Sequence, residues 1–523
     1  MQPQPLSKSK SIEQRFNEYD GKRGTLLRNC EQYAAWTLPY LFPKEHNQPD
    51  NQEILNPPET IGARGVNHLA NKVVTAMFRP QGPFFRLRLD AATRRKVKAA
   101  KGSNADKVFA QLESDFADLE KEAIEHLDMV EFRPIATLAA KYLIVTGNAL
   151  MFHPPKGAPQ VYSLRDYVII RDLSGEVIEL ITRESKAFET FHPDVQQQIR
   201  SLRADKKEIA ATDDITVYTQ VILEDDGRYH AKQEAGGVAL KLADAAWPRH
   251  LLPWIPLVWN RIRGANYGHG LVSEYAKAFH SINVLEDALL AIAGVVSDIK
   301  FLVNPASHLD VVELNNSPPG SYHPGKEGDV TQITLDKYND LQFLQNQIDR
   351  YERRLGEVFM LNSAVTRDAE RVTAEEIRRQ AYELETSFGG MYSQQAMQWQ
   401  VPTANILLYQ IGFDSRLNGI EPQIITGMDS LSRQGEMENI HMWLADLALL
   451  EQLPEDVRAR ISIERYGEFT GAARQVNYKQ IMKTEDELKA DQARALEANG
   501  ALAQQQAAAA VAQEAGKQAI KGE

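Results

Sequence analysis

Two long helical segments that bracket a short irregular module constrain the fold more than any other feature of this sequence. The first runs from Leu271 to about Lys300, and the second from about Tyr338 to Met360, each with an apolar stripe at helical spacing. Between them, Asn304 to about Leu335 is interrupted by several prolines and glycines, which break regular structure. A helix of about 30 residues is roughly 45 Å long, so the pattern predicts a stalk with a small module at its far end.

The first of these segments is also unusually apolar. Its second half is apolar almost all round, so neighbours must bury it, and we expect a single chain to have too little to cover it. The most apolar run, Leu285–Val296, contains Asp287 and is far shorter than the ~20 residues that a membrane span needs. The N-terminal stretch MQPQPLSKSKSIEQRFNEYD has no apolar segment typical of a signal peptide. We therefore expect no membrane partner.

Elsewhere the chain is mainly helical, with one β-rich region. Helices are predicted over Ile61–Phe78, Ala105–Leu127, Pro134–Ile144, Tyr392–Gly412, Glu436–Leu453 and Glu455–Tyr466. Residues 148–265 are mainly β: a hairpin over Gln160–Arg183 turns at Ser174–Gly175, and strands follow at Ile215–Leu223 and within Leu252–Arg263. Short strands are also expected at Val311–Leu314 and Val330–Leu335, inside the irregular module. The fold class is therefore α+β, mainly α.

The C-terminal third begins with a polar break. NSAVTRDAER follows Leu361, after which Thr373 and Glu376 form a capping box that starts another helix. From Asp491 the chain is rich in Ala and Gln, a composition that favours helix but leaves little apolar stripe for docking. Two alternatives remain for this tail: it is frayed in a single chain, or it forms a helical bundle in a ring of identical chains.

Neither the composition nor the motifs indicate an enzyme. The 523 residues carry a formal net charge of −12, which argues against a protein that coats nucleic acid. The single cysteine, Cys30, excludes an intrachain disulfide and a thiolate metal cluster. No P-loop, dinucleotide-binding loop or Gly-x-Ser-x-Gly motif occurs, and the histidines lack metal-ligand spacing. Because catalytic groups are set in space, this lowers the case for an enzyme without excluding it; no catalytic residue, metal or cofactor is expected.

One local cluster is strongly basic. Arg94, Arg95, Lys96, Lys98 and Lys101 follow one another closely. Two interpretations are open: a solvated helix end with its loop, or a contact with DNA or a partner.

Four sequence blocks carry a family resemblance. These are Asn29–His46, Gly62–Phe78, Tyr162–Glu184 and, most closely, FMLNSAVTRDAERVTAEEIRRQAYELE at Phe359–Glu385. They resemble the portal (head-to-tail connector) proteins of short-tailed bacteriophages, of the podovirus and autographivirus type. The blocks keep the order of that family over about residues 25 to 400.

The resemblance implies a viral portal fold with a wing, a two-helix stem, a clip and a helical crown, and a small β region in the wing. The corresponding expectations are a wing at 1–265 that is β-rich over 148–265, a first stem helix at 266–300, a clip at 301–337, a second stem helix at 338–361, a channel loop at 362–372, a returning wing helix and crown at 373–480, and an Ala/Gln-rich tail or barrel at 481–523.

The same resemblance implies a non-enzymatic ring of twelve chains at one capsid vertex. The ring would nucleate head assembly with the major capsid and scaffold proteins, dock the terminase, pass double-stranded DNA, and contact tail adaptor and internal core proteins. Its location would be the virion, and the host cytoplasm during assembly. Two other classes remain as alternatives: another structural virion protein (internal core or scaffold), and a DNA-handling enzyme such as the terminase, which the missing P-loop argues against.

Arg367 and Arg371 are the candidate site residues. Both lie in the polar break at 362–372, which the resemblance places at the narrowest point of the DNA channel. Repeated around a ring, each arginine becomes a circle of positive charges that can contact phosphates. Asp368 and Glu370 would limit that grip; the other interpretation is a solvated loop in which these acids are local partners.

Overall fold

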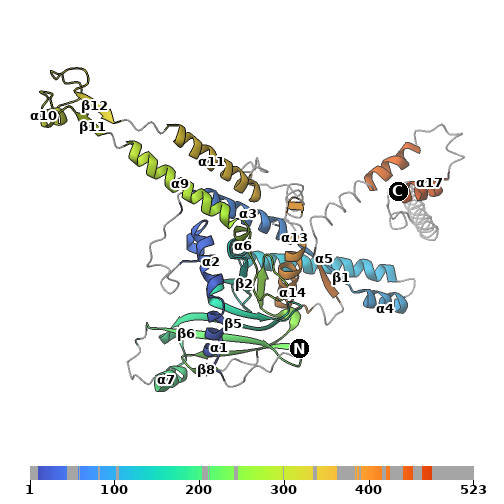
Figure 1. The fold of residues 1–523 in the computed structure, drawn as a ribbon. Coiled ribbons are helices and arrows are strands. Elements are labelled where there is room, and N and C mark those ends of the chain that lie inside the picture. The colour runs from blue at the N-terminus through green and yellow to red at the C-terminus, as the bar shows by residue number, and fades with distance from the viewer. Residues whose placement is uncertain are drawn as a thin grey trace, which may run out of the picture. The chain divides into compact units, whose positions relative to one another are not determined.

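The computed structural model describes residues 10–43, 57, 59–79, 83–101, 105–202, 210, 212–240, 245–297, 300–333, 338–361, 383, 386–387, 390–414, 420–424, 440–450 and 462–473. The chain forms two compact units, Met1–Gly427 and Met428–Glu523, and each is described by itself. The predicted mainly helical α+β class is confirmed (Figure 1).

The helical layer of the first unit consists of α3 (Ile61–Met77), α5 (Ala105–Met129) and α6 (Phe132–Thr146). All three were predicted, with ends that differ by one or two residues. Helix α3 packs on α6. Leu69, Val73 and Met77, the predicted apolar stripe of α3, are buried, so the helical spacing identified the face that packs.

Two elements of this layer were not predicted. Strand β1 (Phe85–Leu89) pairs antiparallel with β13 (Ile420–Ile424), a partner more than 300 residues away in the sequence. Helix α4 (Ala91–Lys101) follows β1 and contains the basic cluster. Arg94, Arg95, Lys96 and Lys98 lie exposed on this helix, as one interpretation expected, but the helix runs on to Lys101, where a loop was expected.

The β-rich region forms two sheets, as the sequence of residues 148–265 indicated. The larger has the order β4 (Tyr167–Arg171), β5 (Val177–Ala187), β6 (Asp214–Leu223), β7 (Arg228–Ala235) and β8 (Val238–Leu240), with β9 (Ala246–Pro248) paired to β7. The smaller has the order β10 (Trp254–Val258), β2 (Asn148–Phe152) and β3 (Gln160–Tyr162). A helix, α7 (Pro193–Leu202), interrupts the β region and was not predicted.

The predicted hairpin turn at Ser174–Gly175 is confirmed. It joins β4 to β5, where the Asp172 carboxylate accepts hydrogen bonds from the backbone N–H groups of Gly175 and Glu176, at 2.7 and 2.8 Å. Gly175 has a φ of 102°, a backbone conformation that residues other than glycine rarely adopt.

The N-terminal helix α1 (Ile12–Gly21) is anchored to the larger sheet by a buried ion pair. Arg15 Nε donates to Glu179 Oε1 of β5 at 2.8 Å, and the Tyr19 hydroxyl donates to Glu179 Oε2 at 2.9 Å. Phe16 packs beside this pair against Tyr218 of β6, with ring centroids 5.4 Å apart. The next helix, α2 (Gly24–Ala35), packs on α6.

An aromatic cluster lies at the centre of the main core. Phe78 contacts Phe132 edge to face at 4.7 Å and Trp399 at 5.3 Å between ring centroids. Trp399 belongs to one helical segment made of α13 (Met391–Gln395), a π-helical stretch (Ala396–Gln400) and α14 (Val401–Gln410). This segment matches the helix predicted at Tyr392–Gly412.

The second unit contains two described helices, Ile440–Leu449 and α17 (Ile463–Ala473). Buried Trp443 joins them, because its indole N–H donates to the Gly467 carbonyl at 2.9 Å. The first helix lies within the predicted Glu436–Leu453, whereas α17 continues past the predicted end at Tyr466. The predicted Thr373-capped helix and the Ala/Gln-rich tail lie outside the described residues.

Candidate functional site

An antiparallel helical hairpin is the most distinctive feature of the first unit (Figure 1). It consists of α9 (Ala276–Ser297), preceded by the short α8 (Leu271–Glu274), and α11 (Tyr338–Val358). The two predicted long helices are thereby confirmed, with a break at Tyr275 in the first. Figure 1 shows α9 and α11 side by side, and the two helices are in contact.

The base of the hairpin packs into the main core. Phe279 of α9 and Phe359, just after α11, lie 6.0 Å apart between ring centroids, and both are fully buried. Gly65 of α3 makes room for this contact, because a Cβ on Gly65 would lie 2.3 Å from the Phe359 ring. Ile282 and Ile348 extend the buried seam between the two helices.

Farther from the core, α9 is largely exposed, in agreement with the expectation that a single chain has too little to cover it. Val284, Leu290 and Val295 are 52%, 60% and 58% exposed. By length and composition, the helical segment Ala276–Val295 could cross a membrane, and only 11% of its most apolar stretch is buried within the chain. The shorter run Leu285–Val296, considered in the sequence, is too short to indicate such a span. Exposed apolar surface of this extent marks an interaction site.

A small module joins the outer ends of the two helices. Strands β11 (Lys300–Val303) and β12 (Val330–Ile333) pair antiparallel and close it. The expected strand at Val311–Leu314 is instead the helix α10 (Val311–Asn316), because the Asp310 carboxylate accepts from the N–H groups of Val312 and Glu313 and caps a helix over the β propensity of the valines. The module exposes several large apolar side chains, among them Phe301, Leu302, Val311, Val312 and Tyr322.

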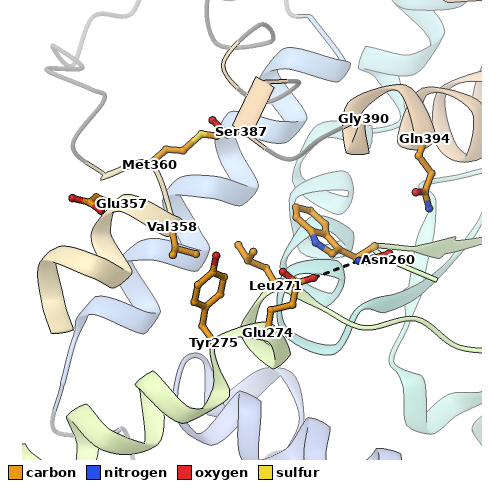
Figure 2. A pocket seen from close by; sticks show the side chains of 11 residues that line it. Asn260, Leu271, Glu274, Tyr275, Glu357, Val358, Met360, Ser387, Gly390 and Gln394 are labelled. Atoms are coloured by element: carbon orange, nitrogen blue, oxygen red, sulfur yellow. Dashed lines mark hydrogen bonds between the residues drawn. The ribbon is translucent and has the colours of Figure 1, made fainter. Parts of the chain in front are cut away.

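A pocket of about 680 Å³ lies where the hairpin joins the core (Figure 2). Figure 2 shows Tyr275 pointing from the start of α9 toward Val358 of α11, and the Asn260 amide donates to Glu274 Oε1 at 3.4 Å. The chain turns beyond α11 at Met360, whose φ of 56° is uncommon for a residue other than glycine. Glu274 and Glu357 are the only charged side chains among the described lining residues.

Three carboxylates meet near the inner part of the hairpin. Glu59 accepts a hydrogen bond from the Gly62 N–H at 3.1 Å, at the start of α3. Burial, together with the negative charges of Glu352 and Glu286, raises the pKa of Glu59 to about 7. Burial and the charge of Glu352 also raise the pKa of Glu286. Within the described residues, no group of His, Cys, Asp or Glu side chains could hold a metal ion.

The predicted channel residues Arg367 and Arg371 lie outside the described residues. The basic cluster is described only in part: Arg94 lies 5.5 Å over the Phe109 ring of α5. A second basic group, which was not predicted from the sequence, consists of the exposed Arg350, Arg353 and Arg354 of α11. Their spacing of three and four residues, on the side of the helix opposite the apolar stripe, was the signal that could have found them.

Comparison with known proteins connects this hairpin architecture to one family. A family profile described as "Bacteriophage head to tail connecting protein" matches residues 9–476. The chain is 32% identical to the "Portal protein" of Enterobacteria phage SP6. The 485 aligned residues cover 92% of each chain. It is 30% identical to the "Portal protein" of Escherichia phage T7, over 86% of this chain and 83% of that protein.

A third relative, the "Portal protein" of Pseudomonas phage phiKMV, is 30% identical over 90% of this chain and 91% of that protein. Among solved structures, the neck of a native gene transfer agent particle aligns over 76% of this chain and 88% of that chain, with 12% identity and a TM-score of 0.33. The chain belongs to the family of bacteriophage head-to-tail connecting proteins.

Proposed function

We propose that this chain assembles into a closed ring of about twelve copies, the arrangement that a head-to-tail interface gives when its rotation closes. The observation that carries the proposal is the exposed apolar face of α9, with Val284, Leu290 and Val295 half or more exposed. A single chain leaves this surface in water, whereas a neighbouring copy can cover it on every chain of the ring.

The ring acts as the portal of a tailed phage. It sits at one vertex of the virion capsid and is assembled in the host cytoplasm with the major capsid and scaffold proteins. It docks the terminase, passes double-stranded DNA, and then receives tail adaptor proteins, with internal core proteins on the head side. The chain itself is structural and hydrolyses nothing. Membership of the connector family and the hairpin that projects from the core support this role.

The parts of the chain divide this work. Residues 1–265 are the wing, 266–300 and 338–361 the stem, which runs along the ring axis, and 301–337 the clip that contacts terminase and tail. Residues 362–372 are the channel loop, and 373–480 and 481–523 the crown and a tail or barrel. The exposed apolar side chains of the module between β11 and β12 support its assignment as a docking clip.

The net charge of −12 supports a conduit for DNA. A wall with net negative charge repels phosphates, so a moving duplex is not trapped. Arg367 and Arg371 are the proposed exception, two circles of positive charge that retain packaged DNA until the tail is attached.

Negative-stain electron microscopy and light scattering of the purified protein test the proposal. Closed rings with a central channel are expected at micromolar concentration, with no ATP hydrolysis in any assembly state. A stable monomer of 58.8 kDa at that concentration would refute ring formation.

A further inference from the structure

The two outward faces of the hairpin are complementary to each other. On α11, buried Ile348 and Leu355 lie on the side toward α9, whereas Arg350, Arg353 and Arg354 are exposed on the opposite side. Together with Asn346 and Asp349 these arginines line one pocket, and none of them forms an ion pair with another described residue. On α9, the face turned away from α11 is apolar, and Asp287 is its exposed acid between Val284 and Leu290.

The charged groups on the two outward faces also lie at the same level, meaning the same position along the axis of the hairpin. Phe279 lies beside Phe359, and Glu352 is close enough to Glu286 to raise the pKa of Glu286. A step of seven residues along α9 therefore corresponds to seven residues back along α11. In this register Asp287 lies level with the turn between Arg350 and Arg354, which spans about 6 Å along the axis.

The same register places a second pair at one level, nearer the outer end. Val295 of α9 lies level with Phe343 of α11, and these side chains are 58% and 61% exposed. Both belong to the outward faces. One level therefore carries opposite charges on the two outward faces, and the other level carries apolar side chains on both. Within one chain the two faces point away from each other.

We propose that the outward face of α9 packs against the outward face of α11 in a second copy of this chain, with Asp287 between Arg350 and Arg354 of that copy. This inference rests on the proposed ring. Rotation about the ring axis leaves every group at its own level, so groups that share a level in one chain meet across the interface. The methylene groups of the arginines cover Val284 and Leu290, while their guanidinium groups reach the carboxylate.

Charge reversal on each face tests the pairing. Asp287→Arg places a fourth arginine against Arg350, Arg353 and Arg354 at every interface, and the double variant Arg350→Asp with Arg354→Asp places two carboxylates against Asp287. Because like charges face each other across an interface, each variant alone should need at least about tenfold more protein for half-assembly. Asp225→Arg, the same change at an exposed turn of the β region, is the matched control and should assemble like the parent.

Mixing the two defective proteins is the decisive step. In an alternating ring, the reversed α9 face of one protein meets the reversed α11 face of the other, and the two native faces meet at the next interface. The equimolar mixture should therefore recover rings at parental concentration. The pairing would be overturned if either variant alone formed rings at the concentration of the parent, or if the mixture formed no rings at that concentration.

Two further outcomes are separated by the same measurements. If the arginine variant assembles normally and only packages DNA poorly, α11 faces the duplex and the pairing is wrong. If the parent itself forms no rings, the proposed function fails, and the failure is visible before any variant is compared. Circular dichroism of each variant checks that the exposed substitutions leave the chain folded.

Discussion

Leu290→Ser should weaken ring assembly without destabilising the chain. Leu290 is 60% exposed on the outward face of α9. Because complete burial of a leucine contributes about 1.5–3 kcal/mol, covering the part that remains exposed is worth about 1–2 kcal/mol at each interface. The loss corresponds to a factor of about 5–30 in the equilibrium constant of one interface.

The loss occurs at every interface of the ring. The protein concentration for half-assembly should therefore rise by at least the single-interface factor of about 5–30. Mass photometry over a dilution series measures that concentration. The free energy of unfolding of the dissociated chain should change by no more than about 0.5 kcal/mol, as is usual for exposed positions.

Leu173→Ser is the matched control, because Leu173 is 73% exposed in the β4–β5 turn and receives the same substitution. It should assemble at the parental concentration. Parental assembly of Leu290→Ser would refute the assignment of this α9 face to the interface. Equal weakening by both substitutions would show that lost surface hydrophobicity in general, rather than this face, drives association.

Four other outcomes are expected. Replacing residues 304–329, which β11 and β12 enclose, with a short flexible linker should leave rings intact but abolish terminase and tail binding in pull-down assays. Arg367→Ala and Arg371→Ala, made separately, should assemble normally but reduce DNA packaging or retention, measured as the full-length DNA protected per head. Glu179→Ala should destabilise the chain by about 3–5 kcal/mol in chemical unfolding, because it removes the carboxylate that forms the ion pair with buried Arg15. Burial raises the pKa of Glu59 to about 7. Its protonated form therefore stabilises the fold below about pH 4.5, and this contribution, roughly 3 kcal/mol, is lost as the pH rises through 7; Glu59→Gln should flatten the dependence of the unfolding temperature on pH.

Each of these expectations has a contrary result. Loss of rings after the module is replaced would make it part of the assembly interface. Arginine variants that package and retain full-length DNA like the parent would leave Arg367 and Arg371 as ordinary loop residues. A Glu179→Ala chain as stable as the parent would show that Arg15 finds another partner or water. A steep pH dependence that persists in Glu59→Gln would assign it to other groups.

Local pattern was enough to predict the elements that form within one stretch of chain. The stripes of α3, α9 and α11 and the Ser174–Gly175 hairpin depend on spacing and turn chemistry a few residues apart, and these were identified from the sequence. Val311–Leu314 was misread although its determinant is local, because the capping Asp310 outweighs the β propensity of two valines.

Contacts between distant segments were decided only by the tertiary structure. The strand β1 depends on β13, and no local feature of Phe85–Leu89 identifies a partner near residue 420. The burial of Glu59 beside Glu286 and Glu352 arises because three helical segments meet there. The stripe of α9 showed that its residues need cover. Only the packed chain shows that α11 covers one face and leaves Val284, Leu290 and Val295 in water, because a helix touches its neighbour along one side alone.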